Sequence, residues 1–146
     1  MITVYTDGSC LGNPGIGGWA FVLKSESQHL SHYGYEKETT NNRMELTAAI
    51  KALEFLNKND ELLTIITDSN YLKNGINSWI LNWKNNNWKT AAKKSVKNQD
   101  LWIILDNLTI SKDISWEWVK GHSTNQYNNE ADELARDAAE NLVQSF

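Results

Sequence analysis

The chain has 146 residues and 40% hydrophobic content, which is the size and composition of one ordinary domain. Its longest apolar runs, Trp19 to Leu23 and Leu101 to Leu105, are far shorter than the ~18 residues needed to cross a bilayer. The formal net charge of -4 by itself argues against a nucleic-acid partner, because such proteins usually carry excess positive charge against the phosphates.

The N-terminal third predicts three strands. Ile2 to Thr6 alternates as a strand should, and it runs into Asp7 and a glycine-rich turn. Five of the eight glycines and the only proline fall between Gly8 and Gly18. The segments Trp19 to Lys24 and Gln28 to Glu36 are two more predicted strands, so we expect a three-stranded antiparallel meander.

A helix and a buried strand are predicted next. Asn41 to Glu45 opens an amphipathic helix that ends near residues 57–60. Its apolar stripe consists of Leu46, Ala49, Ile50, Leu53 and Leu56. Leu62 to Asp68 is a nearly all-apolar run, typical of a strand buried on both faces, and it also ends on an aspartate. Ser69 can cap a further helix that continues to about Trp83.

The segment from Trp79 to Asn98 is strongly basic. It contains no acid, so it carries +5 and leaves -9 for the rest of the chain. Its lysines are Lys84, Lys89, Lys93, Lys94 and Lys97. Three tryptophans accompany them, a composition suited to gripping a nucleic-acid backbone, although tryptophans four residues apart on a helix more often belong to a core. One basic lobe on an acidic body therefore reverses the argument from net charge.

The C-terminal third predicts two helices around one strand. Asp100 to Leu108 is a predicted helix, Ile114 to Val119 alternates as a strand, and a polar loop from Gly121 to Tyr127 leads to the last helix. The buried stripe of that helix is predicted as Ala131, Leu134, Ala135, Ala138 and Leu142. This order of elements predicts one α/β domain over residues 1–146, with a mixed five-stranded sheet flanked by helices.

Four acids stand at the ends of predicted strands or in the first turns of predicted helices. Asp7 and Asp68 each end a strand, and neighbouring strands lie about 4.8 Å apart. Glu45 and Asp132 each fall in the first turn of a helix. Anions this close repel one another unless a cation intervenes. Hard oxygen donors without a Cys or His cluster suit magnesium or manganese rather than zinc.

Each acid also has an ordinary structural explanation. Glu45 completes a capping-box spacing with Asn42, and the helix dipole favours Asp132 in a first turn. Asp7 can be a turn residue, and Asp68 a strand terminator. Composition and periodicity do not decide between these alternatives, so the decision rests on whether the acids belong to one recognisable set of motifs.

Five motifs, in one order, resemble the signatures of bacterial-type ribonuclease HI. They are Thr6-Asp7-Gly8-Ser9-Cys10-Leu11-Gly12-Asn13-Pro14-Gly15, Thr40-Asn41-Asn42-Arg43-Met44-Glu45-Leu46, Thr67-Asp68-Ser69, Val119-Lys120-Gly121-His122 and Asp132-Glu133-Leu134-Ala135. The likeness covers essentially the whole chain, including a basic protrusion at about residues 79–98. It implies a ribonuclease H-like sheet of three antiparallel strands followed by two parallel ones.

The resemblance implies an endonuclease that hydrolyses the RNA strand of RNA–DNA hybrids, giving 5′-phosphate and 3′-hydroxyl products. The implied metal-binding and catalytic carboxylates are Asp7, Glu45, Asp68 and Asp132. In that family two Mg²⁺ ions, for which Mn²⁺ is an expected substitute, prepare the attacking water and stabilise the leaving 3′ oxygen. His122 is expected to be catalytic by moving protons or helping product release, in a loop where Thr124 replaces a common glycine.

The same resemblance implies a set of substrate-binding residues. They are Cys10, Asn13, Thr40, Asn41, Asn42, Asn70, Trp79 and Asn128. Asn13 and Thr40 are expected near a DNA phosphate, and Asn70 stands where relatives often carry glutamine. The ordinary alternatives are turn formation and capping for the asparagines and simple packing for Cys10. Residues 85–87 lack the extra basic side chains of some relatives, which predicts modest, salt-sensitive affinity.

Three other functions compete with this one. Gly15 to Ala20 matches the GxGxxA pattern of dinucleotide-binding folds, but that pattern requires a following helix and Trp19 to Lys24 is a predicted strand. A catalytically silent hybrid-binding module gains nothing from acids that face phosphates. Another nuclease or an integrase on this fold shares carboxylates at strand ends but is not expected to show the asparagine-rich motifs.

The cysteine content and the first residues bear on the compartment. Cys10 is the only cysteine, so no intrachain disulfide can form, which fits a reducing environment. The N-terminal residues do not show a secretory signal. We therefore expect a cytoplasmic protein without membrane association. We also expect a monomer without an obligatory protein partner, with dimerisation through the tryptophan-rich lobe as the alternative.

Overall fold

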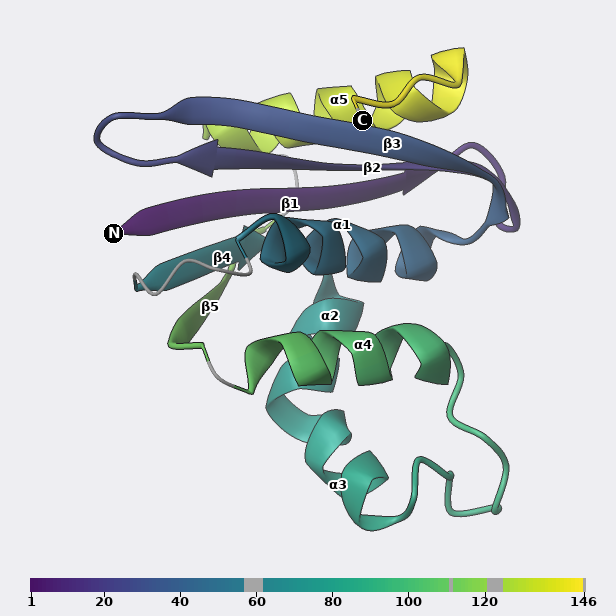
Figure 1. The fold of residues 1–146 in the computed structure, drawn as a ribbon. Helices are drawn as coiled ribbons and strands as arrows, with labels where there is room; N and C mark the ends of the chain where they lie inside the picture. Colours follow the sequence, from purple (N-terminus) through teal and green to yellow (C-terminus); the bar gives the residue numbers. More distant parts are fainter. Residues whose placement is uncertain (57–61, 111, 121–124, 146) are drawn as a thin grey trace.

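The computed structural model describes residues 1–56, 62–110, 112–120 and 125–145, and its centre is a five-stranded sheet (Figure 1). The strand order is β3-β2-β1-β4-β5. β2 pairs antiparallel with both β1 and β3, whereas β4 pairs parallel with β1 and β5. The predicted fold class is therefore confirmed. The strands are β1 (Ile2–Cys10), β2 (Gly15–Lys24), β3 (His29–Thr39), β4 (Leu63–Thr67) and β5 (Ile114–Trp118).

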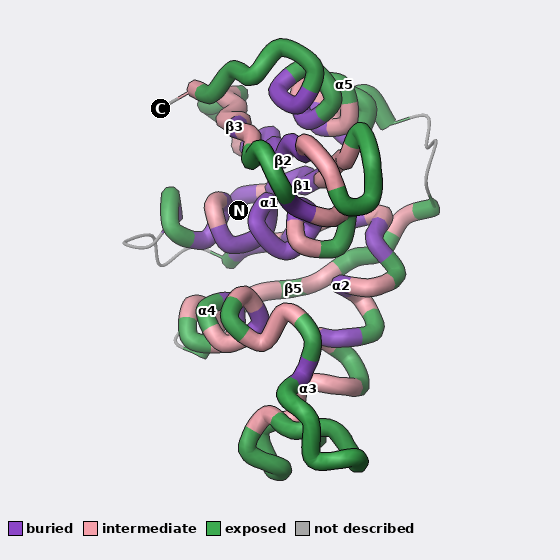
Figure 2. The backbone as a smooth tube through the Cα atoms, turned by 90° about the vertical axis from the view of Figure 1, so that its right-hand side faces the viewer, coloured by how far each residue is buried: buried purple, intermediate pink, exposed green. Residues whose placement is uncertain are grey.

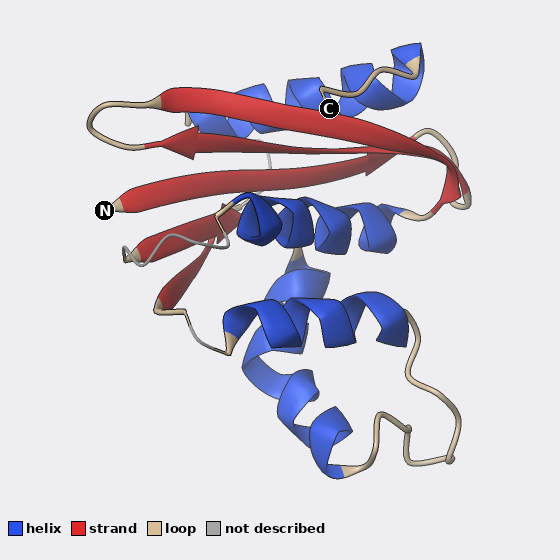
Figure 3. Ribbon diagram, viewed as in Figure 1, coloured by secondary structure: helices blue, strands red, loops and turns tan. Residues whose placement is uncertain are grey.

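The helices cover both faces of the sheet (Figure 3). α5 packs over β1, β2 and β3, and α1 packs on the opposite face against β1 and β2. In the described ranges, no helix is long and apolar enough to span a membrane. The helices are α1 (Asn41–Phe55), α2 (Asn70–Asn74), the π-helical turn η1 (Gly75–Trp79), α3 (Ile80–Asn85), α4 (Gln99–Thr109) and α5 (Gln126–Asn141).

The two faces of β1 belong to two buried clusters. Val4 points into the larger cluster with Leu53 of α1 and Trp102 of α4. Its neighbour Tyr5 points to the other face, where Ala131 of α5 packs against it. Because successive side chains of a strand point to opposite faces, the alternation in β1 joins both helical layers to one central strand. Figure 2 shows this buried centre and the exposed lobe beyond α3.

Several predicted boundaries are wrong, for identifiable reasons. β1 extends to Cys10 and β2 begins at Gly15, so much of the expected turn is paired strand. Gly18 is needed there because a Cβ would overlap the Ala135 backbone of α5. β4 is fully buried on one face only, since α5 lies over the first three strands. Leu142, expected in the buried stripe, is 44% exposed because α5 ends at Asn141.

Candidate active site

Three of the four predicted carboxylates meet at one end of the sheet. Asp7 lies on β1, Asp68 directly follows β4, and Glu45 lies on α1. Each offers one carboxylate oxygen, and these oxygens lie within 4.8 Å of one another. The parallel register pairs Tyr5 with Ile66, so two residues further along both strands present an aspartate at the same edge. The sheet therefore brings together acids that are 61 residues apart.

Glu45 reaches the cluster because α1 approaches β1 closely. The helix begins at Asn41, one residue before the cap that the spacing of Asn42 and Glu45 suggested. Thr40 is the N-cap, and its hydroxyl accepts a hydrogen bond from the Arg43 amide at 3.2 Å. Glu45 is thus in the second turn, and its capping-box explanation is wrong. A Cβ on Gly8 would overlap the backbone of Met44 and Glu45, so glycine permits this approach. The Gly8 amide also donates a hydrogen bond to the Glu45 carboxylate.

The peptide groups around Asp68 are fixed by neighbouring side chains. The Ser69 amide donates to the Thr67 hydroxyl at 3.1 Å, and the Trp118 indole Nε1 donates to the Asp68 carbonyl at 3.2 Å. Lys73 Nζ lies 4.6 Å from the centroid of the Trp118 ring. Trp118 was not predicted as a site residue from the sequence, because only the pairing of β5 with β4 places it beside this strand end. The peptide group that links Asp68 to Ser69 is therefore held at both its carbonyl and its amide.

Burial and mutual repulsion make the cluster electrostatically costly. Asp7 and Glu45 are each only 5% exposed. Burial, followed by the charges of Glu45 and Asp68, raises the pKa of Asp7 to about 10. Burial and the charge of Asp68 likewise raise the pKa of Glu45 well above its usual value. Without a cation the Asp7 carboxyl group therefore retains its proton at neutral pH.

A divalent cation fits the donor set. Among the residues that the structure describes, Glu45 Oε1 is buried without a hydrogen-bond partner. A buried carboxylate oxygen in that state is normally compensated by a proton or a cation. Three clustered carboxylate oxygens are the hard ligands that Mg²⁺, Mn²⁺ and Ca²⁺ prefer. A metal ion bound beside Glu45 Oε1 would supply the partner that this oxygen lacks among the described residues.

Asp132 lies at the margin of the cluster. It interacts with Asp7 through a side-chain hydrogen bond and through its charge, and both raise the pKa of Asp7. Its side chain is 51% exposed and forms an ion pair with Arg136 at 3.2 Å. The expected first-turn position is wrong, because α5 begins at Gln126 after its cap Asn125. The helix-dipole explanation for Asp132 loses its basis, and its position beside Asp7 fits a fourth carboxylate.

Several predicted substrate-binding residues meet at the start of α1. The Asn41 amide donates to Asn13 Oδ1 at 3.2 Å, so the β1–β2 turn is tied to α1 beside Thr40. Asn13, Asn41 and Asn42 are exposed, and Asn70 is exposed at the first position of α2. We call the five residues Asn13, Thr40, Asn41, Asn42 and Asn70 the asparagine groove, after the minor groove of the hybrid that they are expected to line. The Thr40 hydroxyl accepts a hydrogen bond when it caps α1, so its own hydrogen can still be donated to a ligand. Capping and binding roles are therefore compatible there.

The remaining predicted site residues are more buried, or lie outside the described ranges. Cys10 is half-buried, and its thiol donates to the Gly12 carbonyl. Asn128 is 4% exposed in the first turn of α5. Trp79 is half-buried, with its ring centroid 5.7 Å from that of Tyr71. His122 and Thr124 lie outside the described residues.

The basic lobe, residues 79–98, contains one lysine that already has an acidic partner. Lys84 Nζ lies 3.2 Å from Asp106 Oδ2 of α4, an acid just outside the segment whose charge was counted. All five lysines of the lobe are exposed. The Trp83 ring lies 5.4 Å from Trp102 and 6.2 Å from Trp88. Trp83 and Trp88 therefore brace the lobe and leave the lysines for a ligand.

Comparison with known proteins gives one consistent result. A family model described as RNase H matches residues 1–140. Ribonuclease H of Francisella tularensis subsp. novicida (strain U112) is 57% identical over 142 residues, covering 97% of this chain and 93% of that protein. Ribonuclease H of Francisella philomiragia subsp. philomiragia (strain ATCC 25017 / CCUG 19701 / FSC 153 / O#319-036) gives the same identity and coverage.

Solved structures agree in fold. The crystal structure of LC9-RNase H1, a type 1 RNase H with the type 2 active-site motif, has a TM-score of 0.86 and 29% identity, covering 99% of this chain and 74% of that one. LC11-RNase H1 in complex with an RNA/DNA hybrid has a TM-score of 0.76 and 24% identity, covering 97% and 99% of the two chains. The second likeness supports the fold alone.

Proposed function

The chain belongs to the ribonuclease H family, and on that premise we propose that it hydrolyses the RNA strand of RNA–DNA hybrids with Mg²⁺ held by Asp7, Glu45, Asp68 and Asp132. One observation carries the proposal: the oxygens of three of these acids lie within 4.8 Å of one another at a sheet edge. Burial and repulsion make this cluster unfavourable on its own, and a cation that binds a phosphodiester would compensate both.

The bound metal ions would supply an activated water and charge compensation for the leaving 3′ oxygen. The protein holds the ligands in place: β1 carries Asp7, β4 leads into Asp68, and α1 carries Glu45. Asp7 and Glu45 are buried, so little solvent reaches them. We assign Asp132 as the more exposed fourth ligand. Proton movement by His122 stays a prediction from sequence. The expected products carry a 5′-phosphate and a 3′-hydroxyl.

We propose that substrate binding divides between the asparagine groove and the basic lobe. Amides and the Thr40 hydroxyl can detect 2′-hydroxyl groups and the DNA backbone in a minor groove. The four lysines of the lobe other than Lys84, which pairs with Asp106, contribute sequence-independent attraction to phosphates. Cys10, Trp79 and Asn128 keep their predicted binding roles as proposals. The single-domain assignment and the expectation of a cytoplasmic monomer also remain predictions.

The experiment compares four labelled substrates: an RNA–DNA hybrid, an RNA duplex, a DNA duplex and single-stranded RNA. With Mg²⁺ we expect cleavage of RNA in the hybrid alone, and we expect EDTA to abolish it. Replacing Mg²⁺ with Mn²⁺ should retain activity, because both ions prefer oxygen ligands. Hybrid binding without cleavage would instead indicate a silent binding module, and equal cleavage of duplex DNA would indicate another nuclease of this fold.

A further inference from the structure

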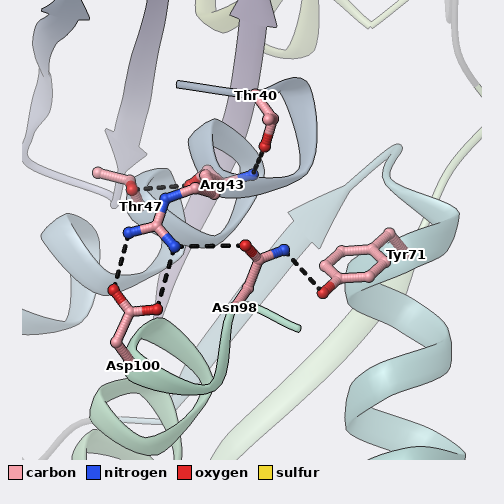
Figure 4. A network of polar contacts seen from close by, with 6 residues as sticks. All are labelled: Thr40, Arg43, Thr47, Tyr71, Asn98 and Asp100. Carbon is pink, nitrogen blue, oxygen red and sulfur yellow. Dashed lines mark hydrogen bonds and ion pairs between the residues drawn. The ribbon is translucent and has the colours of Figure 1, made fainter. Parts of the chain in front are cut away.

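A polar network joins the start of α1 to the start of α4 (Figure 4). Arg43, in the first turn of α1, donates from Nη1 and Nη2 to the two oxygens of Asp100 at 3.0 and 2.8 Å. Nη1 also donates to Asn98 Oδ1 at 3.3 Å. The paired geometry matches the planar fork of guanidinium to a carboxylate, so it fixes orientation as well as distance.

The network continues from Asn98 into α2. Asn98 Nδ2 donates to the Tyr71 hydroxyl at 3.1 Å, and the same hydroxyl accepts from Trp102 Nε1 at 2.9 Å. Asn98 precedes α4 with a left-handed φ of 60°, and its side chain makes no capping bond to that helix. Its amide is used instead to bridge Arg43 and Tyr71. We call these four residues, Arg43, Asp100, Asn98 and Tyr71, the Arg43 network.

Each end of the network lies beside a surface that the proposed function uses. Arg43 directly follows Asn42 of the asparagine groove, and Tyr71 directly follows Asn70. Asn98 ends the basic lobe, and the Tyr71 ring contacts Trp79, where the lobe begins. The network therefore spans the junction between the groove and the two points at which the lobe joins the body.

We infer that Arg43 is a positioning residue for hybrid binding, which holds the basic lobe at a fixed separation from the asparagine groove. This inference rests on the proposed function. Two surfaces reinforce one another on a single rigid duplex only when their spacing is set beforehand, because otherwise binding must also order the junction between them. The Arg43 guanidinium is already occupied by Asp100, and this pairing lowers the pKa of Asp100.

The decisive variant is Asp100→Asn. Its side chain is 61% exposed, so the fold should tolerate the change. By Coulomb's law alone, removing an acid near a polyanion strengthens binding. The positioning role predicts the opposite sign: KM for the hybrid should rise about three- to tenfold, the affinity equivalent of ordering one or two side chains on binding. At saturating hybrid, kcat should change less than twofold, because the carboxylate cluster is untouched.

A mutant cycle tests whether the network acts as a unit. Arg43→Gln should raise KM as Asp100→Asn does, and the double variant should raise it no further. Glu54→Gln is the matched control, since it removes an ion pair with Lys51 on the same helix without touching the lobe. Thermal midpoints of all variants report any purely structural loss.

Three outcomes would overturn the inference. A lower KM in Asp100→Asn combined with a higher KM in Arg43→Gln would show Arg43 to be a direct phosphate contact. A lower thermal midpoint with unchanged KM would show a structural role alone. A fall in kcat at constant KM would place the effect in the cluster. If Arg43→Gln does not fold, the sign of the Asp100→Asn effect still decides, and a parent protein that cuts no hybrid would refute the proposed function instead.

Discussion

The carboxylate cluster and the basic lobe carry opposite charges in opposite surroundings. Asp7 and Glu45 are buried, and backbone contacts of Gly8 and the indole of Trp118 support the cluster. Lys89, Lys93, Lys94 and Lys97 are exposed on a segment braced by tryptophans. Buried charge interacts strongly over short distances, whereas exposed charge is screened and acts by its sum. Activity should therefore be sensitive to the loss of a single oxygen atom in the cluster, whereas substrate binding should depend on the total charge of the lobe.

The largest effect is expected from changes within the cluster. Asp7→Asn or Asp68→Asn should abolish turnover, lowering kcat by roughly 10³-fold or more, because metal-ion catalysis supplies several kcal/mol of transition-state stabilisation. The fold should persist, and the metal-free Asp7→Asn variant should melt higher than the parent at neutral pH, because the parent must take up a proton at Asp7 on folding. Single-turnover cleavage and thermal melting measure both effects. Asp137→Asn, at an exposed position of α5, is the control. An unchanged rate in Asp7→Asn or in Asp68→Asn would contradict the catalytic role assigned to that residue.

A smaller, additive effect is expected from the lobe. Replacing Lys89, Lys93, Lys94 and Lys97 together with glutamine should raise the hybrid KM by about tenfold or more near physiological salt, with kcat nearly constant. For each lysine that binds a phosphate, its removal should also reduce the slope of log affinity against log salt by about 0.9. Lys84→Gln is the matched comparison, because Lys84 already pairs with Asp106. An equal effect from Lys84 would mean that this ion pair opens on binding.

The pH dependence of stability should also separate the two regions. Since the Asp7 pKa is raised to about 10 in the folded state, its folded form keeps a proton that the unfolded chain releases near pH 4. The metal-free protein should thus lose stability as pH rises from about 4 towards 10. Saturating Mg²⁺ should raise the melting temperature and flatten this slope, as should Asp7→Asn. A metal-free slope that is flat above pH 5 would contradict the buried, repelling cluster.

The smallest effect is expected from Trp118→Phe. It keeps an aromatic ring near Lys73 but removes the donor to the Asp68 carbonyl. We expect kcat to fall about threefold and the half-saturating Mg²⁺ concentration to rise by a similar factor, the equivalent of one hydrogen bond, while the hybrid KM stays constant. Magnesium titration by calorimetry provides a readout independent of turnover. Lys73→Gln, which retains the indole donor, should have less effect on magnesium binding.

Local patterns predicted the elements well because their causes are local. Alternation identified β1 and β5, and the apolar stripe identified α1. The predicted opening of α1 at Asn41 is confirmed, but the capping-box spacing of Asn42 pointed to the wrong cap, because the cap is Thr40. The length of β1 was underestimated because glycines that suggest a turn were instead needed where a helix approaches the sheet closely.

By itself the sequence determined the order of strands and helices and the family resemblance, and it singled out the four acids that we propose as metal ligands. Only the tertiary structure decided that Asp7, Glu45 and Asp68 share one buried site with raised pKa values. It also decided that Arg43 binds Asp100 and that Trp118 supports Asp68. The physical reason is that periodicity reflects neighbours within a few residues, whereas burial, charge coupling and hydrogen bonds between distant segments exist only once the sheet has fixed its register.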